Sequence, residues 1–198
     1  MRVGLLVFEQ VDLLDVGGPY EVLLTASRLQ VRDGEEPAFE VLTIGRTRDP
    51  VTAYGGLRLT PQLTIDEASP LDLLVIPGAI AIDDVLADGP LMQALDTATE
   101  QAQTVTSVCT GAFLLGRLGL LDGRRWTTHW EDVDELASRI TGTGERWVRW
   151  VDEGRIVTAG GLSSGIAMAL HLVDRFVGRD LAVRTARQIE YDWDPEAR

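Results

Sequence analysis

The one cysteine of this chain, Cys109, stands where a reactive nucleophile would be placed. It directly follows the β-prone run 104–108 and precedes the small residues 110–112, which can begin a helix. A side chain at such a strand-to-helix turn projects above the edge of a sheet. Free N–H groups and the helix dipole stabilise an anion there, so we expect a thiol with a lowered pKa. A buried structural cysteine is the alternative, since free cysteine is among the most buried residue types.

The elements that must position this cysteine alternate along the chain. A continuous apolar run, typical of a strand covered on both faces, predicts a strand at 3–8. Further strands are predicted at 39–44, 71–76 and 104–108, with a short one at 126–129. Helical patterns occupy 19–28, 82–87, 90–101, 110–119, 130–140, 163–176 and 180–191, and hairpins are predicted at 51–60 and 146–159. This alternation predicts one α/β domain over residues 1–198, with a mostly parallel sheet, helices on both faces and a small β-hairpin.

Ligands of such sheets bind beyond the carboxyl ends of the strands. Three predicted loops meet at that edge: 9–18, which precedes the helix that Pro19 is expected to begin, 77–80, and 109–110. Aspartates before Gly and Pro often cap turns or helices, and a threonine at a helix start often caps its own turn. These structural interpretations apply to Asp15 and Thr110.

Composition limits the partners that we expect. The formal net charge of −13 would repel nucleic acid and anionic membranes. One cysteine excludes an internal disulfide, and the short apolar start is too brief for a signal peptide or a membrane span, so we expect a cytoplasmic protein. Two histidines and one cysteine offer no credible metal-ligand set, and no phosphate-loop or dinucleotide motif is present, so we expect neither metal nor cofactor.

Four segments, taken in order, resemble one protein family. They are LLDVGGPYEVL (13–23), VIPG (75–78), SVCTGAFLLGRLGLLDGRRWTTHW (107–130) and TAGGLSSGI (158–166). The chain resembles the ThiJ/PfpI, or class I glutamine-amidotransferase-like, superfamily. Within it the resemblance is greatest to the isocyanide hydratases, then to the amidotransferase-like domain of AraC-type regulators. It implies a flavodoxin-like three-layer sandwich that forms a homodimer.

The resemblance also implies roles for individual residues. Asp15, rather than the nearby Asp12, matches the acid that contacts the nucleophile, and Thr110 follows Cys109 with a hydroxyl that could bond to the substrate or to Asp15. The pair Cys109-Thr110 replaces the Cys-His pair of the PfpI proteases, which disfavours peptide hydrolysis. The positions that match pocket residues are Gly78, Ala79, Ile80, His129 and Leu162. Trp126 replaces a family alanine, and the sequence does not decide whether its side chain faces the pocket or the core.

Three functions follow from these residues. The first is a cofactor-free hydratase in which the Cys109 thiolate attacks a small electrophilic carbon such as that of an isonitrile, with Asp15 as acid and base. The second is a ligand-sensing domain related to AraC-type regulators, although the chain shows no basic face for DNA. The third is glyoxalase- or deglycase-like chemistry on small aldehydes, which relatives usually perform with Glu at the position of Asp15.

Overall fold

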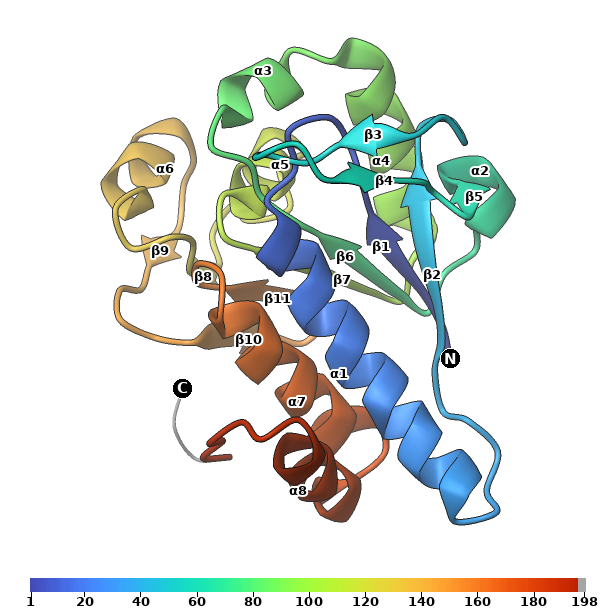
Figure 1. Ribbon diagram of the computed structural model, residues 1–198. Helices are drawn as coiled ribbons and strands as arrows, with labels where there is room; N and C mark the ends of the chain where they lie inside the picture. The colour runs from blue at the N-terminus through green and yellow to red at the C-terminus, as the bar shows by residue number, and fades with distance from the viewer. Residues whose placement is uncertain (196–198) are drawn as a thin grey trace.

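Seven strands form the central sheet of the protein in the computed structural model (Figure 1). The structure describes residues 1–195, so residues 196–198 of the predicted domain lie outside the described residues. Their order is β10-β11-β7-β6-β1-β2-β5, and every neighbouring pair is parallel except β10 and β11. The strands are β1 (Arg2–Leu6), β2 (Glu40–Gly45), β5 (Leu63–Thr64), β6 (Leu73–Ile76), β7 (Thr104–Val108), β10 (Trp150–Glu153) and β11 (Ile156–Ala159). The predicted mostly parallel sheet is confirmed.

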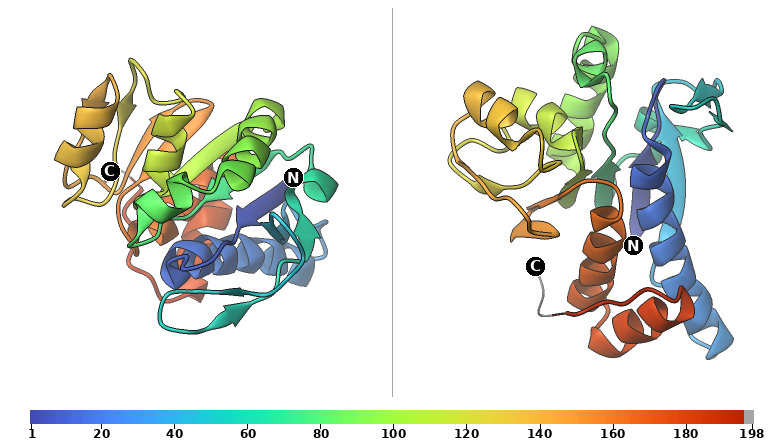
Figure 2. Two further views of the ribbon diagram at one scale, coloured as in Figure 1. Left: turned by 90° about the horizontal axis from the view of Figure 1, so that it is seen from above. Right: turned by 60° about the vertical axis from the view of Figure 1, so that its left-hand side comes forward.

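Helices cover both faces of this sheet (Figure 2). One layer holds α1 (Leu13–Arg32), α7 (Ser164–Phe176) and α8 (Arg179–Gln188), which pack on one another. The other holds α4 (Gly89–Gln101) and α5 (Gly111–Arg117), with α2 (Ile65–Ala68), α3 (Ile82–Leu86) and α6 (Val133–Arg139) packed against them. The flavodoxin-like three-layer sandwich is therefore confirmed. The strands between the layers are buried on both faces, as in β6 and β7, where every residue is buried.

Two small sheets lie outside the central one. The predicted hairpin is present as antiparallel β3 (Val51–Thr52) and β4 (Arg58–Leu59). The strand predicted at 126–129 is reduced to β8 (Arg125–Trp126), which pairs in parallel with β9 (Thr143–Gly144). No helix within residues 1–195 combines the length and apolarity that a membrane crossing needs.

The start of α1 differs from its prediction. The loop expected at 9–18 ends early, because Asp12 caps the helix by accepting a hydrogen bond from the Leu14 N–H at 3.2 Å. Pro19 lies inside the helix, where the bond it cannot donate would have gone to the Asp15 carbonyl. Gly18 is explained by packing, since a Cβ there would lie 3.0 Å from Ile166 Cγ1 on α7. Asp15 consequently lies in the first turn of a long helix.

Candidate active site

Cys109 occupies a strained turn between β7 and α5. Its φ of 56° lies in the left-handed region that residues with a Cβ seldom adopt. Four main-chain contacts hold the turn: the Cys109 N–H donates to the carbonyls of Ala159 and Gly160, and its carbonyl accepts from the Ala112 N–H and the Thr128 hydroxyl. This conformation confirms the predicted sharp strand-to-helix turn. Thr128 was missed, because a hydroxyl 19 residues away gives no local signal.

Asp15 lies beside this turn and is fully buried. Its Oδ2 accepts the Gly78 N–H at 3.0 Å, while its Oδ1 makes no full hydrogen bond among the described residues. Gly78 allows this close approach, because a Cβ would lie 2.5 Å from Thr110 Oγ1, 2.7 Å from the Thr110 nitrogen and 3.0 Å from Asp15 Oδ2. The fold thus joins the ends of β6 and β7 to the first turn of α1.

Burial dominates the electrostatics of the pair. It raises the pKa of Asp15 from 3.8 to about 7, against the lowering effect of the Gly78 N–H; the Asp12 charge raises it further, and the Leu162 N–H and the Cys109 thiol lower it slightly. Burial, and then the negative charge of Asp15, also raise the pKa of the Cys109 thiol, which the Thr110 N–H only partly offsets. The expected lowering of the thiol pKa is therefore wrong, because desolvation outweighs the helix terminus. Cys109 rests as a thiol beside an acid that titrates near neutrality.

Thr110 has a different partner from those expected. Its hydroxyl accepts the Ala79 N–H at 2.9 Å and donates to the Ala79 carbonyl at 2.7 Å. It makes no side-chain bond within its own helix turn. Thr110 therefore fastens the loop after β6 to the nucleophile turn and acts as a positioning residue.

A cavity of about 540 Å³ opens above the cysteine. Four predicted pocket residues line it together with Cys109 and Thr110, namely Ala79, Ile80, His129 and Leu162. Gly78 is not among the lining residues and lies behind the cavity wall against Asp15. Trp126 is fully buried and packs against Gly142 and Gly144, away from the cavity. Cys109 is 9% exposed, so it is not sealed off from this space.

His129 lies at the edge of the cavity. Its Nδ1 is 3.5 Å from Asp132 Oδ2 and 3.7 Å from Glu131 Oε2. Its ring packs on Gly161, where a Cβ would lie 2.3 Å from His129 Cδ2. The histidine therefore joins the loop before α6 to the loop before α7.

Most of the acidic residues around the cavity were not predicted as site residues from the sequence. These residues, called the acidic rim below, are Asp12, Asp83, Asp84, Glu131, Asp132 and Glu135. They come from three separate segments, and α6 begins at Val133 rather than near residue 130, which leaves Glu131 and Asp132 in the preceding loop. No local pattern joins them. Within residues 1–195, no cluster of three or more His, Cys, Asp or Glu side chains could hold a metal ion.

Comparison with known proteins relates this site to characterised ones. The family model described as DJ-1/PfpI matches residues 1–175. The chain is 36% identical over 191 residues to the isonitrile hydratase of Pseudomonas putida, covering 96% of this chain and 78% of that protein. It is 26% identical over 193 residues to the HTH-type transcriptional regulator GbdR of Pseudomonas aeruginosa, covering 96% of this chain but 50% of the regulator. A solved ThiJ/PfpI family protein from Pseudomonas syringae superposes with a TM-score of 0.84 at 25% identity, covering 98% of this chain and 76% of that one.

Proposed function

The chain belongs to the DJ-1/PfpI family, and from that premise we propose that it is a cofactor-free hydratase that adds water to an isonitrile through a covalent bond to Cys109. The product is an N-substituted formamide. The similarity to an isonitrile hydratase over most of the chain supports this substrate class. Cys109, Asp15 and Thr110 form its catalytic centre, with Thr110 in a positioning role.

The observation that carries the proposal is the buried Asp15 carboxyl beside the Cys109 thiol, with Oδ1 left free of full hydrogen bonds among the described residues. A pKa of about 7 suits an acid–base catalyst at neutral pH, because the group can both accept and return a proton. The thiol needs such a partner, since burial keeps it protonated at rest. Asp15 accordingly takes the proton as Cys109 attacks.

The first half of the reaction forms the covalent intermediate. The Cys109 sulfur bonds to the terminal carbon of R–N≡C while its proton passes to Asp15. Asp15 then gives that proton to the same carbon, which leaves a thioimidate, R–N=CH–S–Cys109, and an ionised Asp15. No oxidant or reductant is needed, and the chemistry divides into two easier steps.

The second half releases the product. Asp15 takes a proton from water as the oxygen bonds to the thioimidate carbon, and Asp15 then gives this proton to the nitrogen. The carbon–sulfur bond breaks as the carbonyl forms, and the hydroxyl proton returns to the sulfur through Asp15. The sum is R–NC plus water giving R–NH–CHO, with Cys109 and Asp15 restored.

Turnover of cyclohexyl isocyanide by the purified protein tests this proposal. We expect N-cyclohexylformamide, detected by mass spectrometry, and a thioimidate adduct on Cys109, with the mass of the intact isonitrile added, when the reaction is quenched early. Cys109→Ala should reduce formation to the uncatalysed rate. Absence of product from the wild type, or equal rates in wild type and Cys109→Ala, would overturn the proposal. Loss of methylglyoxal without formamide formation would favour the deglycase-like alternative.

A ligand-sensing role is the second candidate, because the chain is similar to about half of a transcriptional regulator. In that role the cavity binds the isonitrile or a related compound without turnover. Calorimetric binding to the wild type with no formamide would support sensing. Binding that is followed by stoichiometric formamide release would favour the hydratase.

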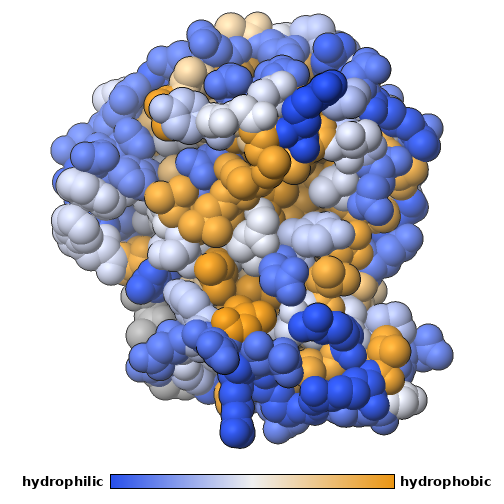
Figure 3. All heavy atoms as spheres, in the orientation of Figure 1, coloured by the Kyte–Doolittle hydropathy of each residue, from blue (hydrophilic) through white to orange (hydrophobic). Residues whose placement is uncertain are grey.

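We also propose that the protein works as a homodimer. Leu13, Leu14, Tyr54, Leu57 and Ile80 are at least 40% exposed, and Figure 3 shows apolar surface on the face that contains the start of α1 and the hairpin. Their segments are adjacent, since the Tyr54 N–H donates to the Val11 carbonyl and Val11 pairs with Ala79. Sedimentation should give a dimer that Leu14→Glu disrupts and Val183→Glu, on α8, does not. A monomeric wild type would refute the assignment.

A further inference from the structure

The acidic rim surrounds a cavity whose lining includes no arginine, and the chain contains no lysine. Six acidic residues therefore line one cavity of about 540 Å³. They are too dispersed to hold a metal within the described residues. A charge excess of this kind in a concave surface creates a negative potential that attracts cations and repels anions.

Arg139 neutralises only part of the rim. Its guanidinium pairs with Asp83 at 2.7 Å and also with Glu135, and it lies over the Phe113 ring outside the cavity lining. Within residues 1–195, Asp12, Asp84, Glu131 and Asp132 form no ion pair with an arginine. Asp132 is partly desolvated and lies near the charges of Glu131 and Glu135, and its pKa is raised by burial and by both charges against the effect of His129.

Asp15 adds a further negative charge beside the nucleophile, behind the residues that line the cavity. It is fully buried next to the nucleophile, with Oδ1 unpaired among the described residues, so the interior of the site has a further negative charge once Asp15 ionises. The charges of Asp15, Asp12 and Asp132 each make it harder to form the Cys109 thiolate. A positive group held at the rim would offset this effect and favour the thiolate.

Apolar side chains line the cavity together with the nucleophile and the carboxylates. Ile80, Ile82, Phe113 and Leu162 line the same cavity as Cys109. They would accommodate a short hydrocarbon segment between a reacting carbon at the sulfur and a polar group at the opening. This arrangement fits a molecule with an electrophilic end and a charged end.

We propose that the substrate of this site has a positively charged substituent, such as a protonated amine, that binds among the carboxylates of the acidic rim while its electrophilic carbon meets Cys109. The inference rests on the proposed attack by Cys109 but not on the isonitrile group itself. Neutral molecules of similar shape react more slowly, and anionic ones are excluded.

Charged thiol reagents of similar size test the preference without any turnover. The Cys109 thiolate attacks the sulfenyl sulfur of a methanethiosulfonate, a disulfide bond forms, and methanesulfinate leaves. The rate of adduct formation on Cys109 is measured by intact-protein mass spectrometry with 2-aminoethyl and with 2-sulfonatoethyl methanethiosulfonate. The ratio of these two rates is then divided by the ratio of the rates at which the same two reagents react with free 2-mercaptoethanol, which gives a normalised ratio. Cys109 is the single cysteine, so the adduct is unambiguous. We expect a normalised ratio of at least about tenfold in favour of the cation, falling as salt rises.

Variants assign the preference to the rim. The double variant Glu131→Gln, Asp132→Asn should lower the normalised ratio several-fold, whereas the matched pair Asp96→Asn, Glu100→Gln on the exposed face of α4 should leave it unchanged. A wild-type ratio within twofold of the 2-mercaptoethanol ratio would overturn the proposal. So would a high ratio that both double variants reduce equally, because the effect would then come from overall charge.

Isonitriles separate this inference from the proposed function. The value of kcat/KM for 4-aminocyclohexyl isocyanide, protonated at neutral pH, should exceed that for cyclohexyl isocyanide by at least about tenfold. Turnover of both at equal kcat/KM would overturn the charge preference and leave the hydratase proposal standing. Failure of both to react, with the reagent selectivity intact, would overturn the hydratase proposal and support the cationic preference of the site.

Discussion

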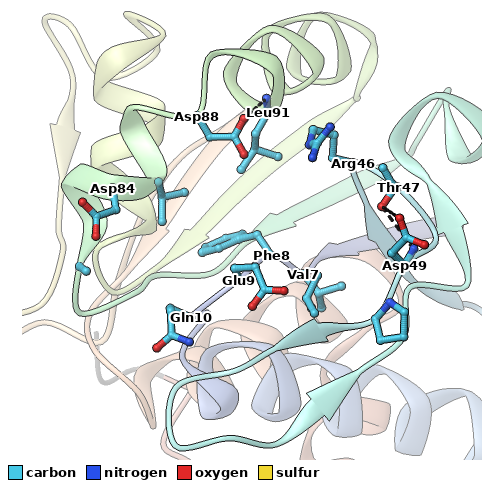
Figure 4. A pocket seen from close by; sticks show the side chains of 14 residues that line it. Val7, Phe8, Glu9, Gln10, Arg46, Thr47, Asp49, Asp84, Asp88 and Leu91 are labelled. Carbon is cyan, nitrogen blue, oxygen red and sulfur yellow. Dashed lines mark hydrogen bonds between the residues drawn. The ribbon is translucent and has the colours of Figure 1, made fainter.

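Two cavities flank the segment that leads into α3, and they differ in how their polar groups are satisfied. The cavity above Cys109 and a second one of about 340 Å³ share Ala81 and Asp84. The second cavity lies where β1 and β2 end, and Figure 4 shows Phe8 and Glu9 on one side of it with Asp88 and Leu91 on the other. Both have apolar walls and several carboxyl groups, so composition alone does not distinguish them.

Three of the four acidic residues that line the second cavity, Glu9, Asp49 and Asp88, make structural hydrogen bonds. Asp88 accepts the Leu91 N–H at 3.0 Å and caps α4, and Asp49 accepts the Thr47 hydroxyl at 3.1 Å, both drawn as dashed lines in Figure 4. Glu9 accepts the Thr52 N–H at 3.0 Å. Beside Cys109, by contrast, Asp15 is fully buried with one oxygen unpaired among the described residues. An unsatisfied buried carboxyl next to a nucleophile, rather than a hollow with acids, marks a reactive site.

The largest expected difference between the cavities is in catalysis. Asp15→Asn keeps an acceptor for the Gly78 N–H but cannot take the thiol proton, so formamide formation should fall about 10²- to 10⁴-fold. Asp88→Asn is the matched control, since Asn caps a helix as well as Asp and should leave the rate unchanged. Steady-state rates with cyclohexyl isocyanide check both. Similar losses in the two variants would remove the distinction drawn between the cavities.

The variant Asp15→Asn, although less active, should be more stable than the wild type above neutral pH. Burial raises the pKa of Asp15 from 3.8 to about 7, so its contribution to stability is fully present below 3.8 and is lost as pH rises through 7. Asp15→Asn avoids burying that charge, and at pH 8 its free energy of unfolding should exceed that of the wild type by at most about 4 kcal/mol. Urea unfolding at pH 4, 6 and 8 measures the gap, which should shrink toward pH 4. A gap that stays constant with pH would contradict the raised pKa.

Glycine substitutions compare how tightly the two regions are packed. Gly78→Ala forces a Cβ against the Thr110 main chain and Asp15, so we expect a loss of about 1–3 kcal/mol in stability and a lower turnover rate. Gly89→Ala, at the start of α4, meets no atom within 4 Å and should change stability by less than about 0.5 kcal/mol. Thermal unfolding of the two variants gives the comparison. Equal changes would show that the turn beside Gly78 can relax.

The smallest expected effect concerns the threonines of the two cavities. Thr110→Val removes both bonds to Ala79 in a buried place and should cost about 1 kcal/mol, whereas Thr110→Ser keeps them. Thr47→Val loses only two exposed bonds with Asp49 and should be close to neutral. Urea unfolding resolves these differences, and kcat should follow the same order. A Thr110→Val variant with wild-type stability and kcat would refute the positioning role.

Local sequence was sufficient for the nucleophile turn and for most of the sheet. The run 104–108 is rich in Val and Thr and leads directly into Cys109 and the small residues after it, and the structure places β7, the turn and α5 there. Such features depend on neighbours a few positions apart, which a pattern can report. The start of α1 was the exception, because Gly17-Gly18-Pro19 signals a break that the close packing of Gly18 on α7 overrides.

The chemistry of the cysteine was decided only by the tertiary structure. Cys109 was correctly predicted to lie on an elbow, yet its pKa moves opposite to the expected direction, because burial and the charge of Asp15 outweigh the helix terminus. Asp15 and Gly78 are 63 residues apart, Thr110 and Ala79 are 31, and the acidic rim joins three segments. The local sequence was therefore enough to predict a nucleophile at Cys109. Desolvation and Coulomb energies depend on distances in space, so only the folded structure determined the charge around that nucleophile.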